Sequence, residues 1–444
     1  MLKTGEKIRK LRQDKGLSQA KLSELLQVNQ AFLSSVELGK QDPSDAFITK
    51  TLSLVSKISV EEIAQLKKKR TRHAGTIKRG RSIEQLKHIP LKAFKENPTG
   101  PTAISLFSGC GGMCLGFENA GFQILGYVEI DPELREIYQL NFPNTRLLGG
   151  DITQISDSEV KSWFKIFPPM DVIFGGPPCQ GFSLAGKRNV NDPRNMLFTH
   201  MARLSDIIRP RYVVFENVRL LTSMKAPDGS SIHSHITAAF AKIGYRTHMA
   251  EMNVMDYGVP QFRERVILIA VRDDLPDIKQ AFPAATHGPQ SPMQDLFSPA
   301  LSRYKTFREA TQDLPSLQPG ETSPNDPLHF AVAHPPHVVE WLCHTPEGCS
   351  AHENLELRHR PPSGYNTTYK RLRWDEPSGT IQTTFGMISA SRSVHPTDNR
   401  SLTIREAMRC QTFPDDFSIV GKIGTVRTAI GNALPPFFAE VLAA

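Results

Sequence analysis

Asp171-Val-Ile-Phe-Gly-Gly-Pro-Pro-Cys-Gln-Gly-Phe-Ser183 reads as a buried strand that stops abruptly in a stiff loop. The apolar run from Val172 to Phe174 predicts the strand, and two glycines and two prolines end it. Cys179 therefore lies at the carboxyl end of a strand, where open α/β sheets place ligands and reactive groups. A cysteine in such a turn is by itself more often a packing thiol than a nucleophile, so its role depends on the rest of the chain.

Composition bounds the class of protein. The 444 residues allow two or three domains with a full-sized core. Six irregularly spaced cysteines favour a reducing compartment. No apolar run is long enough to cross a bilayer and no secretory signal opens the chain, so we expect a cytoplasmic, nucleoid-associated protein without a membrane partner. The net charge of +8 favours a polyanionic partner.

The first 66 residues have the apolar spacing of a small helical bundle. Periodicity alone fits a plain interaction module. The order of residue types from Leu17-Ser-Gln19 to Gly39-Lys-Gln-Asp-Pro43 resembles the phage-repressor type of helix-turn-helix. That resemblance implies that Gln19 starts the second helix and that the helix from about Gln30 to Leu38 enters the major groove. The implied DNA-binding side chains are Gln19, Gln30, Ser34 and Ser35.

A basic linker is expected from residue 67 to residue 99, because its Lys and Arg run contains no acid up to Arg81. Such a run is usually a solvated tether, and it is also placed to neutralise phosphates. Beyond it we expect a catalytic, cofactor-binding domain over residues 100–272, a target-recognition domain over 273–424 and a returning C-terminal helix over 425–444.

The catalytic half opens with the strand–glycine loop–helix pattern of a doubly wound sheet. A short apolar strand from Ala103 to Phe107 precedes Ser108-Gly-Cys-Gly-Gly112. Glu129 ends the next strand, where a ribose diol is typically bound, and Asp151 ends a third unit. Either acid alone is more often a cap or a surface charge, but together they describe an adenosine pocket.

Gly-Gly-Pro-Pro-Cys179-Gln-Gly-Phe-Ser resembles the nucleophile loop of DNA cytosine-5 methyltransferases, including those of type II restriction–modification systems. Phe107-Ser-Gly-Cys-Gly-Gly112 resembles the S-adenosylmethionine site of the same family. The resemblance implies a Rossmann-like methyltransferase sheet with a smaller, loop-rich target-recognition domain. The implied cofactor-binding residues are Phe107, Gly109, Gly111, Glu129, Ile130, Asp151, Pro178, Leu197 and Asn432.

Two further motifs complete the implied catalytic set. Glu216-Asn-Val218 follows an apolar strand, and Gln261-Phe-Arg263-Glu-Arg265 precedes another. By themselves these residues suit a helix cap or a solvated strand edge. The resemblance instead makes Cys179 the nucleophile and Glu216 the carboxyl group that holds the target base. It aims Arg263 and Arg265 at the active site and the DNA backbone.

The region from Asp273 to about Arg400 is rich in proline and polar residues, as in the recognition regions of this family. Arg371 and Arg373 stand among aromatics, which suits DNA contact. Histidines and two cysteines also gather here, but without a Cys-x-x-Cys pair we expect no metal site. Cys110 and Cys114 are interpreted as packing residues on the glycine loop.

The expected function is methylation of C5 of a flipped cytosine in a specific duplex sequence. The amino-terminal module is expected to repress the enzyme's own promoter and to form a homodimer on it. Two alternatives stay open: a tRNA cytosine-5 methyltransferase, and a catalytically dead DNA-binding repressor.

Overall fold

The computed structural model describes residues 8–10, 12–13, 19–26, 30–37, 51, 100–163, 169–178, 196–226, 229–276, 278, 281–289 and 301–444. The chain divides into two compact units, Met1–Arg81 and Ser82–Ala444. No helix among the described residues is long and apolar enough to cross a membrane.

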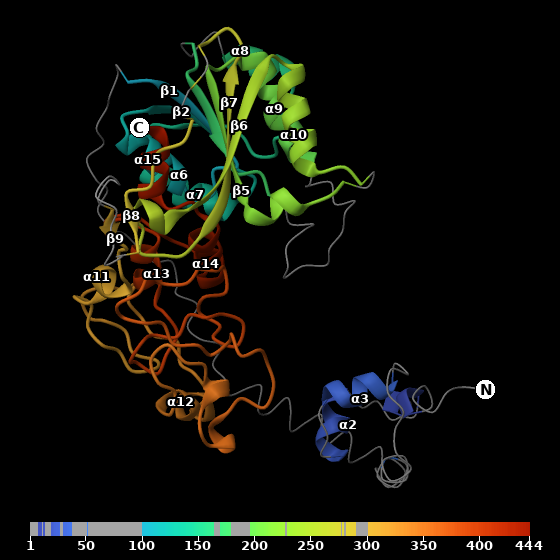
Figure 1. Cartoon of the computed structure of the whole chain (residues 1–444), viewed down its shortest axis with the longest axis vertical. Coiled ribbons are helices and arrows are strands. Elements are labelled where there is room, and N and C mark those ends of the chain that lie inside the picture. The colour runs from blue at the N-terminus through green and yellow to red at the C-terminus, as the bar shows by residue number, and fades with distance from the viewer. Residues whose placement is uncertain are drawn as a thin grey trace. The chain divides into compact units, whose positions relative to one another are not determined.

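The amino-terminal unit contains the two helices expected of a helix-turn-helix, α2 (Gln19–Leu26) and α3 (Gln30–Glu37) (Figure 1). Leucines and a valine at helical spacing are fully buried between them: Leu22, Leu26, Leu33 and Val36. Arg12 pairs with Glu37 through two bonds of 2.6 and 2.8 Å. Glu37 also accepts from the Gln19 amide at 2.8 Å, so the start of α2 is tied to the end of α3.

The second unit is built on a seven-stranded sheet with the order β3-β2-β1-β4-β5-β7-β6. The strands are β1 (Thr102–Leu106), β2 (Gln123–Val128), β3 (Arg146–Gly149), β4 (Val172–Gly175), β5 (Tyr212–Val218), β6 (Tyr245–Asn253) and β7 (Glu264–Arg272). Neighbouring strands among β1 to β5 pair in parallel, and β7 runs antiparallel to both β5 and β6. The strand order reverses between β1 and β4, which is where such sheets bind ligands.

Helices cover both faces of this sheet, as expected for the predicted fold class (Figure 1). One core takes side chains from α6 (Gly112–Asn119), α7 (Pro132–Asn141), α14 (Ile423–Asn432) and α15 (Pro436–Ala443). The other takes them from α8 (Asp157–Trp163), α9 (Leu197–Ile208) and α10 (Ile232–Lys242). Successive residues of β4 alternate between the two cores, because side chains of a strand point to opposite faces.

The carboxyl terminus returns to the catalytic half as two helices rather than the single one expected. Pro435 occupies the N-cap position of α15 and Pro436 its first helical position, where proline suits the start of a new helix. A Cβ atom at Gly116 of α6 would lie 2.4 Å from the Pro436 carbonyl oxygen. The glycine therefore lets α15 pack directly on α6.

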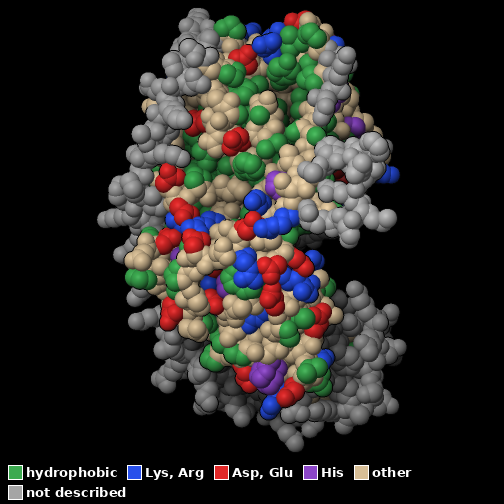
Figure 2. Space-filling model, turned by 60° about the vertical axis from the view of Figure 1, so that its left-hand side comes forward, with side chains coloured by type: hydrophobic (Ala, Val, Ile, Leu, Met, Phe, Trp, Pro, Cys, Tyr) green, Lys and Arg blue, Asp and Glu red, His purple; other side chains and the backbone are tan. Residues whose placement is uncertain are grey.

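The recognition region has few regular elements, as expected. Its elements are β8 (His287–Gly288), β9 (Ser302–Arg303), α11 (Phe307–Thr311), α12 (Pro336–Cys343) and the short 3-10 helices η5 (Ala351–Glu353) and η6 (Leu357–His359); α13 (Ile404–Cys410) follows. Two further 3-10 helices, η3 (Arg219–Ser223) and η4 (Val254–Tyr257), follow β5 and β6. Among the described residues on the face seen in Figure 2, cationic and anionic side chains are intermingled and do not separate into a single basic patch.

Candidate active site

Glu216 and Arg265 form an ion pair at the carboxyl end of β5. The Arg265 Nε lies 2.7 Å from the Glu216 Oε1, and the two side chains are 13% and 14% exposed. The antiparallel register pairs Val218 with Arg265, which places Arg265 on the same face as Glu216. Burial lowers the pKa of Arg265 while Glu216 opposes this effect. The carboxylate is thus held in one orientation.

The loop that leads to Cys179 packs against Glu216 of this ion pair. A Cβ atom at Gly176 would lie 2.6 Å from the Glu216 Oε2, so only glycine leaves room for the carboxylate. The Asn217 amide donates to the Pro177 carbonyl at 3.0 Å. Pro178 is half-buried, and Cys179 itself lies outside the described residues. Asn217, for which the sequence suggested no role, therefore braces the loop segment that precedes Cys179.

Arg263 does not face the solvent, and the expectation that it reaches a DNA phosphate is corrected. Its side chain is fully buried. Its guanidinium donates to the carbonyls of Ile381, at 3.2 Å, and Gly431, at 2.9 Å. Arg263 therefore joins the start of β7 to the recognition region and to α14. Only Arg265 of the two arginines contacts Glu216 through an ion pair.

Gln261 is buried, and its side-chain amide connects distant segments of the chain. It belongs to a sequence motif, but the motif did not indicate this role. Its amide donates to the Gln411 Oε1 at 2.9 Å and accepts from the Ile381 amide at 2.9 Å. The Gln411 amide in turn donates to the Ile430 carbonyl at 2.5 Å. Three segments far apart in sequence meet at these two glutamines.

The glycine loop after β1 contacts Glu129, which follows β2. This contact lies on the β2 side of the β1–β4 switch point. Gly109 and Gly111 have φ angles of 58° and 96°, and Phe107 has a φ of 55°. The Gly109 amide donates to the Glu129 Oε2 at 2.7 Å, and the Asp131 amide donates to its Oε1 at 2.9 Å. Burial raises the pKa of Glu129. Backbone amides thus hold this carboxylate beside the loop.

The surroundings of Glu129 suit an adenosine. Ile130, the next residue, is apolar and 65% exposed, and a Cβ atom at Gly109 would have no other atom within 4 Å. Asp151 accepts from the Thr153 amide at 2.9 Å and from its hydroxyl at 2.8 Å. The remaining predicted residues are half-buried Leu197 at the start of α9 and exposed Asn432 at the end of α14. These surroundings fit S-adenosylmethionine. Glu129 provides an acid for the ribose, Ile130 provides an apolar side chain for the adenine base, and there is open space over Gly109.

The cysteines of the glycine loop are packing residues, as interpreted. Burial raises the pKa of Cys110 and of Cys114 to about 12, so neither is a thiolate near neutral pH.

In the recognition region, His329 contacts Thr403 at 3.0 Å and the Pro315 carbonyl at 2.8 Å. Within the described ranges, no three His, Cys, Asp or Glu residues are grouped to hold a metal ion.

Arg371 is also a structural residue, which corrects its assignment to DNA contact. It is 4% exposed, and its donors are directed at the carbonyls of Thr345, His395, Asp398 and Leu342 and at the Asn399 side chain. All five N–H groups of a guanidinium are thereby used. Arg373 is about half exposed and lies 3.5 Å from Glu376, so it stays a candidate.

The predicted DNA contacts of the amino-terminal unit are placed only in part. Gln19 is engaged with Glu37, and Ser34 is half-buried on α3. The side chains of Gln30 and Ser35 lie outside the described residues.

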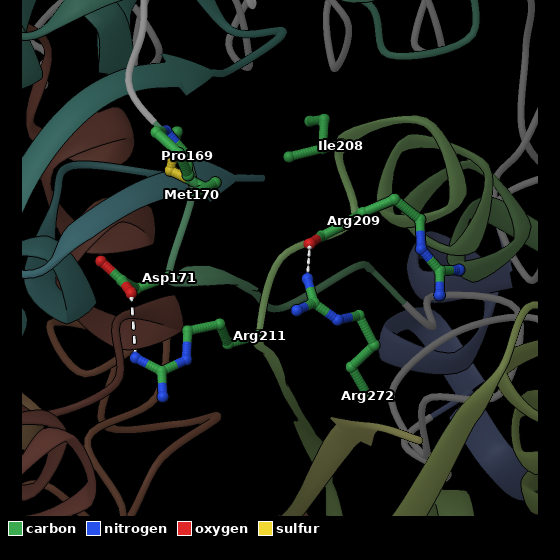
Figure 3. Close-up of a pocket in the computed structure, with 7 residues that line it drawn as sticks. All are labelled: Pro169, Met170, Asp171, Ile208, Arg209, Arg211 and Arg272. Carbon is green, nitrogen blue, oxygen red and sulfur yellow. Dashed lines mark hydrogen bonds and ion pairs between the residues drawn. The ribbon is translucent and has the colours of Figure 1, made fainter. Parts of the chain in front are cut away.

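A separate pocket of about 480 Å³ lies at the opposite edge of the sheet (Figure 3). Asp171 and Arg211, which line it, precede β4 and β5 rather than follow them. Their side chains are 3.6 Å apart, and Arg272 donates to the Arg209 carbonyl. Its arginines thus contact groups of the protein, and its position separates it from the acids at the carboxyl ends of the strands.

Comparisons with known proteins agree with this geometry. Residues 102–444 match the family model of the C-5 cytosine-specific DNA methylase, and residues 8–50 match a helix-turn-helix family. The Type II methyltransferase M1.HphI of Haemophilus parahaemolyticus is 35% identical over 349 residues, covering 77% of this chain and 85% of that protein. The Type II methyltransferase M.DdeI of Desulfomicrobium norvegicum is 31% identical over 378 residues, covering 77% and 87%.

Solved structures show the same fold. A prophage-encoded E. coli protein, described as a DNA modification methyltransferase, superposes with a TM-score of 0.58 at 24% identity and covers 77% of this chain and 97% of its own. The chain therefore belongs to the C-5 cytosine-specific DNA methylase family and is a DNA cytosine-5 methyltransferase with a helix-turn-helix domain at its amino terminus.

Proposed function

We propose that this enzyme methylates C5 of a cytosine that has been flipped out of a specific duplex sequence, with S-adenosylmethionine as methyl donor. The observation that carries the proposal is the position of two acids. Glu129 follows β2 and Glu216 ends β5, and the order β2-β1-β4-β5 brings both acids to one edge of the sheet. A cofactor acid and a base-holding acid thus flank the loop that carries Cys179.

The chemistry needs each of these groups. The Cys179 thiolate adds to C6 of cytosine, and the ring's π electrons move to C5, which becomes nucleophilic. Bound S-adenosylmethionine supplies the electrophilic methyl group that C5 takes. Glu216 contacts the base edge and is kept in place by Arg265. A base then takes the C5 proton, the electrons of the C5–H bond re-form the C5–C6 double bond, and Cys179 leaves C6 as a thiolate.

We propose base flipping because the Glu216 carboxylate is buried. Its side chain is only 14% exposed, and its Oε2 lies 2.6 Å from the position that a Cβ atom on Gly176 would take. A base stacked in a duplex does not present its edge to such a carboxylate. Extrusion of the base costs a few kcal/mol, which the contacts of the flipped base with Glu216 and its neighbours offset.

The test is methylation of a random-sequence duplex library, read by bisulfite sequencing, beside a Cys179→Ala control. We expect protected cytosines within one short motif, and none in the control. A parallel reaction with unmodified tRNA separates the RNA alternative. DNA binding without methylation of either nucleic acid would overturn the proposal and favour a repressor on an inactive scaffold.

We also propose that the amino-terminal module binds the promoter of its own gene as a homodimer within a restriction–modification system. The helix-turn-helix match over residues 8–50 supports it. A footprint of the full chain on that promoter is expected to disappear when residues 1–66 are deleted, while methylation of the target motif persists. An unchanged footprint would refute autoregulation.

A further inference from the structure

The carboxylate of Glu133 connects helix α14 to the cofactor side of the sheet. Glu133 lies in the first turn of α7. The Lys422 ammonium contacts its Oε1 at 2.5 Å, and the Thr425 hydroxyl donates to its Oε2 at 2.6 Å. These hydrogen bonds hold the pKa of Glu133 below its usual range, in accord with a carboxylate that is stabilised by its two partners.

Hydrogen bonds continue from Glu133 to the glycine loop without a break. The Glu133 amide donates to the Asp131 Oδ1 at 2.8 Å. The Asp131 amide donates to the Glu129 Oε1 at 2.9 Å, and the Gly109 amide donates to the Glu129 Oε2 at 2.7 Å. The orientation of the predicted ribose-binding carboxylate is therefore linked to the position of the first turn of α7.

Helix α14 is itself firmly held, so it can serve as a support. At its carboxyl end the Gly431 carbonyl accepts from Arg263 at 2.9 Å, and the Ile430 carbonyl accepts from Gln411 at 2.5 Å. A Cβ atom at Gly431 would lie 2.5 Å from the Thr383 amide nitrogen, which shows how closely the recognition region packs on it. The opposite end of the same helix carries Thr425.

We propose that Glu133 and Thr425 are positioning residues for S-adenosylmethionine. They fix the start of α7 on α14 and thereby orient Glu129 toward the ribose. The inference rests on the proposed cofactor site and adds to it two residues that lie in none of the sequence motifs. Neither residue touches the reacting atoms, so their loss changes cofactor affinity rather than the methyl-transfer step.

The test compares three variants of the full chain. Thr425→Val removes the hydroxyl donor at nearly constant volume, and Thr425→Ser restores it. Asn119→Ala is the matched control, since Asn119 makes another exposed hydrogen bond between the catalytic half and the C-terminal helices, to Glu440 at 3.2 Å. Calorimetry measures the Kd of S-adenosylmethionine, and steady-state kinetics give kcat and the KM for duplex DNA.

We expect Thr425→Val to raise the Kd of S-adenosylmethionine about three- to fivefold, which is less than the full effect of a hydrogen bond to a charged group because the lost bond acts on the cofactor only through Glu129. Thr425→Ser and Asn119→Ala are expected to bind like the unmodified enzyme. The kcat at saturating cofactor and the KM for DNA are expected to stay within about twofold, because the target side is untouched.

The outcomes separate the two proposals. If the unmodified enzyme fails to bind S-adenosylmethionine, the proposed function itself fails. If it binds but Thr425→Val binds equally well, the positioning role is refuted. A parallel loss of cofactor affinity, DNA affinity and melting temperature in Thr425→Val would show a merely structural contact and would also overturn the inference.

Discussion

Replacing Gly176 by alanine tests whether the loop before Cys179 leaves space for the Glu216 carboxylate. The φ angle of Gly176 lies outside the left-handed region, so alanine is compatible with the backbone. Its Cβ, however, would lie 2.6 Å from the Glu216 Oε2, where ordinary contact begins at 3.4 Å. The carboxylate must move by about 0.8 Å, the difference between these distances, while Arg265 holds its other oxygen at 2.7 Å.

A misplacement of about 1 Å near reacting groups costs on the order of 100-fold in rate. We therefore expect Gly176→Ala to lower the single-turnover rate of methyl transfer about 30- to 100-fold. The melting temperature should change little, because the added Cβ meets the end of the Glu216 side chain and not backbone. Quenched-flow measurement with radiolabelled cofactor and a duplex containing the target motif gives the rate.

Two other glycines provide controls. A Cβ atom at Gly424 would have no other atom within 4 Å, so Gly424→Ala should be as active as the unmodified enzyme. A Cβ atom at Gly175 would lie 2.1 Å from the Leu106 carbonyl oxygen, so Gly175→Ala should lower the melting temperature and activity together. A Gly176→Ala enzyme with a rate within about threefold of the original would refute the reasoning.

Three further predictions concern stability and DNA contact. Burial raises the pKa of Glu118 from 4.5 to about 7, so the stability gained from its protonated form is present below pH 4.5 and is lost as the pH rises through 7. Glu118→Gln should remove this loss, an effect on the order of 1 to 3 kcal/mol; denaturant unfolding at pH 5 and pH 8 measures it, and an unchanged pH dependence would contradict it. Arg371→Met leaves several buried carbonyls without donors and should cost about 3 to 5 kcal/mol in urea unfolding, whereas equal stability would show that the carbonyls find other donors. Arg373→Ala should leave unfolding unchanged but reduce the salt dependence of DNA binding by about one counterion, and an unaltered salt slope would exclude a phosphate contact.

The arrangement of the strands could be predicted from the sequence because the glycine loop, Glu129, the Cys179 loop and Glu216 each follow an apolar run or end it. The run from Val172 to Phe174 became β4, and Glu129 follows β2 as expected. Parallel strands bring their carboxyl ends to one edge, so the order of motifs along the chain was enough to place both acids together. Helical spacing predicted the helices of the amino-terminal unit, but only the resemblance in the order of residue types identified them as a helix-turn-helix, which the family match over residues 8–50 confirms.

The roles of the arginines could not be predicted in the same way. Arg263 and Arg265 alternate in sequence as on a solvated strand edge, yet Arg263 is buried and donates to Ile381 and Gly431. Arg371 stands among aromatic and basic residues, which is also typical of a DNA-binding loop. Whether an arginine is buried depends on carbonyl groups that distant segments direct at it, and no local pattern records those groups.

These buried cations explain how a region with few regular elements can keep its loops in place. Arg400 bonds both oxygens of Glu406 at 2.9 Å and contacts Asp398 at 2.7 Å. The attraction of Arg400 holds the pKa of Glu406 at about 2 against the opposing effect of burial, so this carboxylate stays ionised at neutral pH. Breaking such a pair would leave an uncompensated buried charge, at a cost of about 3 to 5 kcal/mol.

Substitutions in the exposed loops between these buried ion pairs and hydrogen bonds carry no such free-energy cost. Leu355 and Tyr365 are 97% and 80% exposed, although Asn354, beside Leu355, is buried and donates to the carbonyls of Trp341 and His359. Substitution of an exposed side chain therefore leaves the hydrogen bonds of its buried neighbour intact. Exposed side chains of this region can therefore change without loosening it, because the hydrogen bonds of Gln261 and Arg263 attach it to the start of β7 and to α14.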